Sequence, residues 1–75
     1  MELKEFIESL AEQFDDTDVT EITANCHFRD LEEYSSLIGM SIIALARTQY
    51  GKSISGADIR SCQTVEDLFN LIKNK

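Results

Sequence analysis

The strongest constraint on the fold is an apolar segment, residues 36–50, that follows a polar and acidic stretch and ends before Gly51. Its apolar side chains recur at intervals of three and four residues, which is the spacing of one face of an α-helix. They are Leu37, Met40, Ala44, Leu45, Ala46 and Tyr50. Glycine commonly lies just past a helix end. The segment therefore predicts a helix over 36–50.

Two serines, Ser35 and Ser36, stand at the start of this helix. Serine is a preferred N-cap, because its hydroxyl oxygen can accept a hydrogen bond from a free amide of the first turn. A hydroxyl at this junction also lies at the positive end of the helix dipole, which favours a bound phosphate. From the local sequence alone, the simple capping role is the more common of the two.

Two other segments have the pattern of amphipathic helices, residues 2–14 and 64–74. In the first, the apolar residues are Leu3, Phe6, Ile7, Leu10 and Phe14. In the second, they are Val65, Leu68, Phe69, Leu71 and Ile72. Thr64 and Asp67 stand in capping-box positions, and a short helix is predicted near 57–61. The expected fold is all-α, a small antiparallel bundle of three main helices plus one short helix.

The connection between the first two main helices, residues 15–27, has no sustained period and is rich in Asp and Thr. A connection this long in a small domain often signals function. Asp18 and Glu21 are spaced for a capping box around one helical turn. The residues expected to anchor the connection in the core are Val19, Ile22 and Phe28.

No metal or catalytic site is expected. The acids that begin at Asp16 resemble the start of a calcium loop, but Glu21 and His27 occupy the positions of its glycine and its final glutamate. Cys26 and His27 are adjacent and cannot easily converge on one ion. We expect Cys26 in the core, His27 at the surface, and Cys62 reduced and buried. No general acid, base and nucleophile can be assembled, so the chain is not expected to be an enzyme.

The charge of the chain is uneven. Residues 1–33 hold eleven acidic and two basic residues, whereas residues 34–75 hold three acidic and five basic ones, within a net charge of −7. Such a surface repels nucleic acid and attracts basic protein partners. No apolar run approaches the ~20 residues of a membrane span, and the start is unlike a signal peptide. The expectation is a single domain, 1–75, that is soluble, cytoplasmic and monomeric, with no membrane insertion.

The chain resembles the acyl carrier protein family, in which an Asp-Ser-Leu sequence carries the attachment serine. Phe28, an acidic loop, and Ser36-Leu37 opening an apolar helix carry the first part of the likeness. Residues 54–59 (Ile-Ser-Gly-Ala-Asp-Ile) are similar to the family's third helix, and residues 64–68 (Thr-Val-Glu-Asp-Leu) to the opening of its last helix. Together with the first helix, the resemblance covers essentially the whole chain.

The resemblance implies that Ser36 carries covalent 4'-phosphopantetheine, which a phosphopantetheinyl transferase takes from coenzyme A. Ser36 is the candidate rather than Ser35, because Leu37 follows it. The thiol of the arm would hold acyl groups as thioesters for the acyl-processing synthase enzymes of fatty acid or polyketide-type biosynthesis. Shelter for the acyl group is expected from Met40, Ile43 and Ala44, beside the first helix.

The chain departs from the family at several positions. Ser35 stands in place of the usual aspartate, and Ile38 where a second acid often follows. Positions that are often glutamate are Ser41, Arg47 and Thr48 here. Docking of partners is therefore expected to use acids before the serine and apolar residues after it. These are Asp30, Glu32, Glu33, Leu37, Ile38 and Met40.

Two alternatives remain open. Within the family, the cargo can be an aminoacyl group, as in peptidyl or D-alanyl carriers, although the paired glycines that often precede the serine of peptidyl carriers are missing. From another class comes an unmodified, acidic, all-α interaction module that binds a basic partner. Intact mass after incubation with coenzyme A and a permissive transferase separates the carriers from the module.

Overall fold

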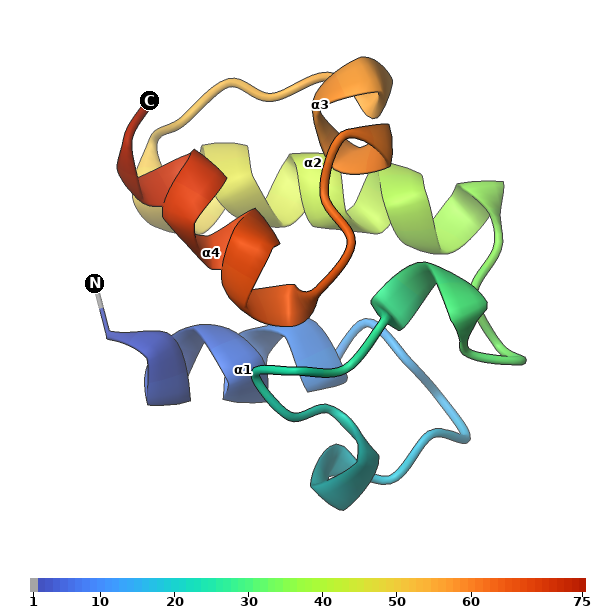
Figure 1. The fold of residues 1–75 in the computed structure, drawn as a ribbon. Coiled ribbons are helices and arrows are strands. Elements are labelled where there is room, and N and C mark those ends of the chain that lie inside the picture. The colour runs from blue at the N-terminus through green and yellow to red at the C-terminus, as the bar shows by residue number, and fades with distance from the viewer. Residues whose placement is uncertain (1) are drawn as a thin grey trace.

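A computed structural model describes residues 2–75 of the chain, and this part of it is all-α (Figure 1). The elements in order are α1 (Leu3–Ala11), the 3₁₀ turns η1 (Val19–Glu21) and η2 (Phe28–Asp30), α2 (Ser36–Tyr50), α3 (Gly56–Arg60) and α4 (Val65–Lys73). Figure 1 shows α1 and α2 running in opposite directions, with α4 crossing obliquely between them and α3 beside α2. The predicted bundle of three main helices and one short helix is confirmed. Among these helices, none has both the length and the apolar character that a membrane crossing requires.

The bounds of α2 are those predicted, and its end follows from the conformation of Gly51. This residue has a φ of 63°, in the left-handed region that glycine adopts without a steric penalty. Its amide donates to the Arg47 carbonyl oxygen at 3.1 Å, and the Lys52 amide donates to the Ala46 carbonyl oxygen at 3.0 Å. These two bonds satisfy carbonyl groups of the last turn and close the helix.

α1 ends at Ala11, three residues before the predicted end. The amides of Gln13 and Phe14 donate to the carbonyl oxygens of Leu10 and Ala11, three residues back, so a tight turn replaces the α-helical bonds. Phe14 is still buried, because the turn directs its ring into the core. The apolar period therefore continues past the end of the helix.

The core lies where α1, α2 and α4 meet. The Phe6 ring packs against Phe69 and Tyr50, with centroid separations of 5.7 and 6.1 Å. The largest fully buried side chains are Phe6, Phe28, Leu10, Ile22, Ile42, Leu68, Ile72 and Val65. The long connection joins this core through its backbone as well, because the Val65 amide donates to the Cys26 carbonyl oxygen at 3.0 Å.

One prediction about buried residues needs correction. Val19 was expected to anchor the connection, but 47% of it is exposed, whereas Ile22 and Phe28 are buried as predicted. No residue of η1 itself is buried, and the buried side chain is that of Ile22, which directly follows it. On α2, Leu37 and Met40 are 72% and 66% exposed. Ala44 is exposed too, while the buried residues are Gly39, Ile42, Leu45 and Ala46.

The exposure of these α2 residues has a physical cause. Residues 37–46 are apolar on nearly every side of the helix, so a period of 3.6 residues does not select one face. Contacts with α1 and α3 select it instead, and Leu37, Met40 and Ala44 remain exposed. An apolar strip on the surface of α2 results.

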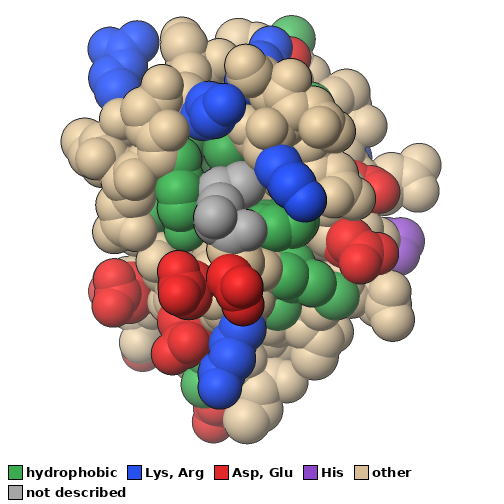
Figure 2. All heavy atoms as spheres, turned by 90° about the vertical axis from the view of Figure 1, so that its left-hand side faces the viewer, with side chains coloured by type: hydrophobic (Ala, Val, Ile, Leu, Met, Phe, Trp, Pro, Cys, Tyr) green, Lys and Arg blue, Asp and Glu red, His purple; other side chains and the backbone are tan. Residues whose placement is uncertain are grey.

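Charge is unevenly distributed over the surface as well. Figure 2 shows acidic side chains gathered over the lower part of one face, the level at which α1 lies in Figure 1, with most of the Lys and Arg side chains above them. Glu2, Glu5, Glu8 and Glu12 are all exposed. The acidic half of the sequence therefore forms an acidic side of the molecule.

Candidate functional site

Ser36 is the first residue of α2, and Ser35 occupies the N-cap position with an extended backbone, φ −151° and ψ 176°. Both serines are exposed. The Ser35 hydroxyl forms no capping hydrogen bond, so its predicted capping role is wrong. The first turn of α2 also contains no acidic residue. Its free amides therefore point at the approach to Ser36 with neither a side-chain cap from Ser35 nor a negative charge to oppose an anion.

The predicted caps elsewhere do form. The start of α1 also lacks a side-chain cap, but its first turn contains Glu5, whereas the first turn of α2 has no acid. The Thr64 hydroxyl accepts from the Asp67 amide at 3.1 Å, and the Asp18 carboxylate accepts from the Thr20 amide at 3.0 Å. A further capping box around Ser55 and Asp58 opens α3. Each of these aspartate carboxylates accepts hydrogen bonds from backbone amides, which lower its pKa below the usual value.

Glu33 ties the segment before the serines to the long connection. Its carboxylate accepts hydrogen bonds from the amides of Asp15 and Asp16 and from the Thr17 hydroxyl, the last at 2.7 Å. The bond from Thr17, together with those from the amides, lowers the pKa of the Glu33 carboxyl. Glu33 was predicted to dock partners, and its carboxylate is engaged in holding residues 15–17 against the segment that precedes the serines.

Tyr34, the residue before the two serines, packs between Phe28 and the first part of α2. Its ring packs edge-on against Phe28, with centroids 5.9 Å apart. Its hydroxyl lies over Gly39, where an added Cβ would stand only 3.0 Å from the Tyr34 oxygen. A residue with a side chain at position 39 would push the ring outward. The close approach explains why glycine stands inside this helix.

The other predicted docking residues lie on both sides of Ser36. Asp30 and Glu32 are exposed before it, and Leu37 and Met40 are exposed after it. Ile38 is half-buried and packs against the core, as expected if only one residue of the Leu37-Ile38 pair faces solvent. The structure brings these residues around one serine, and their docking role stays a prediction.

A groove of about 490 Å³ runs beside Ser36 between α2 and α3. Its apolar lining comes from Tyr34, Met40, Ile43 and Ile59, and Arg29 and Arg60 lie at its edge. Met40 and Ile43 were expected to line a shelter beside the first helix. That location is wrong, because these side chains turn toward α3. Ala44 lines an adjoining apolar hollow of about 310 Å³, together with Met40, Ile43, Arg47 and Thr48.

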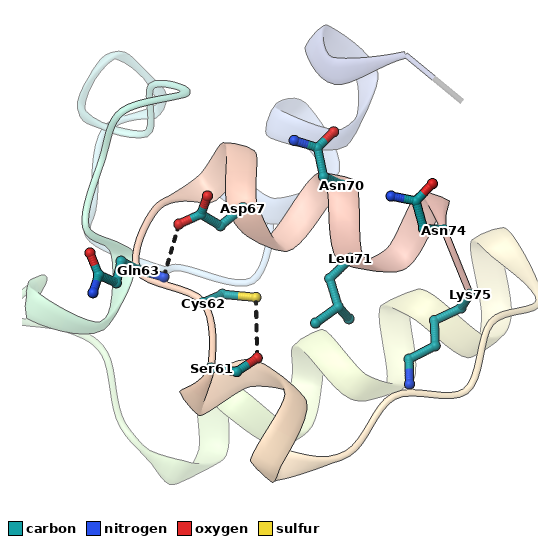
Figure 3. A pocket seen from close by; sticks show the side chains of 8 residues that line it. All are labelled: Ser61, Cys62, Gln63, Asp67, Asn70, Leu71, Asn74 and Lys75. Carbon is teal, nitrogen blue, oxygen red and sulfur yellow. Dashed lines mark hydrogen bonds between the residues drawn. The ribbon is translucent and has the colours of Figure 1, made fainter.

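A wider hollow of about 740 Å³ lies along α4 and shares no residue with this groove (Figure 3). Figure 3 shows the Asp67 carboxylate accepting from the Gln63 amide, a bond of 3.2 Å, with Asn70 and Asn74 further along the helix. Asp67 also accepts from the Thr64 amide at 3.1 Å. The acid of this hollow is thus occupied in capping α4, and no residue of the serine region reaches it.

The thiols have the surroundings of structural cysteines. Cys62 is buried and its Sγ donates to the Asp58 carbonyl oxygen at 3.4 Å, while Cys26 is half-buried. Burial raises the pKa of both thiols. His27 is exposed beside Asp30, with Nδ1 3.8 Å from a carboxylate oxygen. Within residues 2–75, no group of three His, Cys, Asp or Glu side chains is placed to hold a metal ion.

The two arginines of the groove were not foreseen. Arg29 belongs to η2 and is held by its bonds to the Cys62 carbonyl oxygen, and Arg60 belongs to the end of α3, which packs against α2. Their sequence neighbourhoods carry no motif that points to this. Tyr34 could have been suspected, since a large aromatic residue next to a helix start often packs onto it.

Comparison with known proteins gives one match. Residues 4–72 match the model of a family described as the phosphopantetheine attachment site. Searches of curated proteins and of solved structures found no significant match. The matched range spans α1 to α4 and includes Ser36 and the groove beside it.

Proposed function

We propose that the chain, which belongs to the family of phosphopantetheine attachment-site domains, is an acyl carrier protein of fatty acid or polyketide-type biosynthesis. Its phosphopantetheine arm would be attached to Ser36. The family carries 4'-phosphopantetheine as a covalent group. When bound, the group supplies a thiol that holds an acyl chain as a thioester. The chain's own part is to present the serine, hold the phosphate and shelter the acyl group.

The observation that carries the proposal is the open start of α2. Ser36 is exposed, it begins a 15-residue helix, and neither a side-chain cap nor an acid competes for the amides of the first turn. A phosphodiester on the Ser36 oxygen would meet these N–H donors and the positive end of the helix dipole. Ser35 is exposed too, but it precedes the helix and is not followed by leucine.

The partners fit the same surface. A phosphopantetheinyl transferase with a basic face would be drawn to Asp30 and Glu32, which are exposed just before the serines. Leu37 and Met40 then offer apolar contact on the other side of Ser36. Synthase enzymes that process the acyl group would use the same two-sided surface. We place the protein in the cytoplasm, where coenzyme A and these enzymes meet it.

The test is the intact mass of the protein after incubation with coenzyme A and a permissive transferase. A gain equal to one phosphopantetheinyl group, located by peptide mapping to Ser36, supports the proposal. No gain, under conditions in which a second carrier protein is fully modified, would favour the unmodified interaction module. An aminoacyl cargo has no specific support here, since the paired glycines that often precede the serine of peptidyl carriers are missing.

A further inference from the structure

The groove beside Ser36 holds two positive charges that no carboxylate neutralises. Arg29 and Arg60 both line it. Between residues 2 and 75, the ion pairs that form are His27 with Asp30 and Lys75 with Asp58, and neither involves an arginine. In a chain of net charge −7, two arginines without carboxylate partners in one groove are unexpected on electrostatic grounds.

Arg29 is fixed in place. Its Nε and Nη2 atoms donate to the carbonyl oxygen of Cys62, at 3.1 and 2.9 Å. A guanidinium has five N–H donors, so three remain after these two bonds. The side chain thereby links η2 to the loop between α3 and α4, with free donors left for an acceptor in the groove.

Arg60 is folded back along α3. Its Nη1 atom lies 3.3 Å from the position that a Cβ on Gly56 would take. Glycine at position 56 therefore leaves room for the guanidinium over the first turn of this helix. The one acid of α3, Asp58, is engaged elsewhere: its carboxylate accepts from the Ser55 amide at 3.0 Å and pairs with Lys75 at 3.2 Å.

Apart from the two serines at its head, the rest of the lining is mainly apolar, and Ile43 and Ile59 connect it to the core. Charges beside apolar walls interact more strongly with a ligand than charges in open water. The planar fork of a guanidinium matches the two oxygens of a carboxylate. A groove with these features suits a short carbon chain that ends in a carboxylate.

We infer that the groove between α2 and α3 favours acyl groups with a terminal carboxylate, held by Arg60 and Arg29. This inference rests on the proposed function and adds to it the class of cargo. The phosphate of the arm has other donors, the free amides at the start of α2, and does not need the arginines. The flexible arm lets the group at its end return to the groove beside Ser36.

The test compares two cargoes of equal carbon number, adipoyl and hexanoyl, loaded onto Ser36 from their coenzyme A thioesters and verified by intact mass. The apo protein and the phosphopantetheinylated protein with a free thiol serve as reference samples. The readouts are the NMR signals of the Arg60 side-chain Nε–H and the Gly56 amide. The variants are Arg60→Gln and, as a matched control, Arg47→Gln, an exposed arginine outside this groove. Arg29 is left unchanged because it bonds to Cys62.

The adipoyl form is expected to shift both signals relative to the free-thiol form, and the hexanoyl form to leave the Arg60 signal in place. About 0.5 M salt should reduce the adipoyl shift by half or more, because the screening length falls to about 4 Å. Arg60→Gln should lose the Gly56 shift, whereas Arg47→Gln should keep it.

Equal shifts with both cargoes would overturn the inference. So would an Arg60 shift that is already complete in the free-thiol form, since that result assigns the arginine to the phosphate of the arm. Either outcome leaves the proposed function intact. A wild-type protein that gains no mass would instead refute the carrier function before any spectrum is recorded.

Discussion

The two sides of Ser36 are built on different physical principles. Before the serine, residues 15–35 are anchored in the core by Ile22 and Phe28 but also depend on polar bonds, those to Glu33 and Asp18 and those of the backbone to the start of α4. Their exposed surface is acidic. After it, α2 contains no acid and is held by apolar packing, with an outer surface of Leu37, Met40 and nearby arginines. We therefore expect electrostatic attraction of partners at the first side, and apolar contact and cargo selection at the second.

The largest effect is expected at the junction itself. Ser36→Ala should abolish loading of phosphopantetheine and leave the helical spectrum unchanged, because the removed hydroxyl is exposed and forms no hydrogen bond to a described residue. Ser35→Ala should load at the wild-type rate. Intact mass and circular dichroism measure the two properties, and loading of the Ser36→Ala variant would refute the site.

The acidic side is tested by a charge reversal that avoids Glu33. Asp30→Lys combined with Glu32→Lys should slow modification by a basic-faced transferase about 3- to 10-fold at low salt, mainly through the association rate. The effect should shrink as salt is added. Leu37→Ala should instead slow modification equally at low and high salt. If the double reversal left the rate unchanged, electrostatic attraction would not operate on this side.

The helix starts offer a direct comparison of stability. Thr64→Ala removes a hydroxyl that accepts from the Asp67 amide and should cost about 1 kcal/mol, or about 4–8 °C in Tm. Ser35→Ala removes a hydroxyl without a capping bond and should change stability by less than about 0.5 kcal/mol. Equal losses in thermal melts would show that Ser35 does cap α2 in solution.

The hydrogen bonds that residues 15–17 donate to the Glu33 carboxylate make the acidic side sensitive to pH. The folded-state pKa of this carboxyl is lowered from a usual value of 4.5 by the Thr17 hydroxyl and the amides around it. A carboxyl with a lowered pKa stabilises the fold above its unfolded-state pKa, and this stabilisation is lost as the pH falls through the folded-state pKa.

Glu33→Gln should therefore have a lower Tm than the wild type at neutral pH, and the difference should disappear as the pH falls below about 4.5. Glu32→Gln is the matched control. Glu32 is exposed and forms none of these bonds, so this variant should melt like the wild type. A Glu33→Gln difference that stays constant from neutral to acidic pH would point to lost packing rather than to the carboxylate.

Much of the fold was predictable from sequence because its signals are local. The 36–50 helix, its end at Gly51 and the capping boxes at Asp18 and Thr64 each depend on residues within a few positions of one another. The same holds for the burial of Ile22 and Phe28, since isolated large apolar residues in a polar stretch have few places to go other than the core.

What only the tertiary structure decided is which side of a uniformly apolar helix faces the core, and which distant residues meet at Ser36. Leu37 and Met40 differ little from Ile42 and Leu45 in hydrophobicity, so contacts with α1 and α3 had to select between them. Glu33 meets Thr17 across a long loop, and Arg60 reaches the groove only because α3 packs on α2. The sequence by itself determined that a serine begins a helix, because this is a local feature. The groove beside that serine and the hydrogen bonds to Glu33 are long-range contacts, and no short sequence motif encodes them.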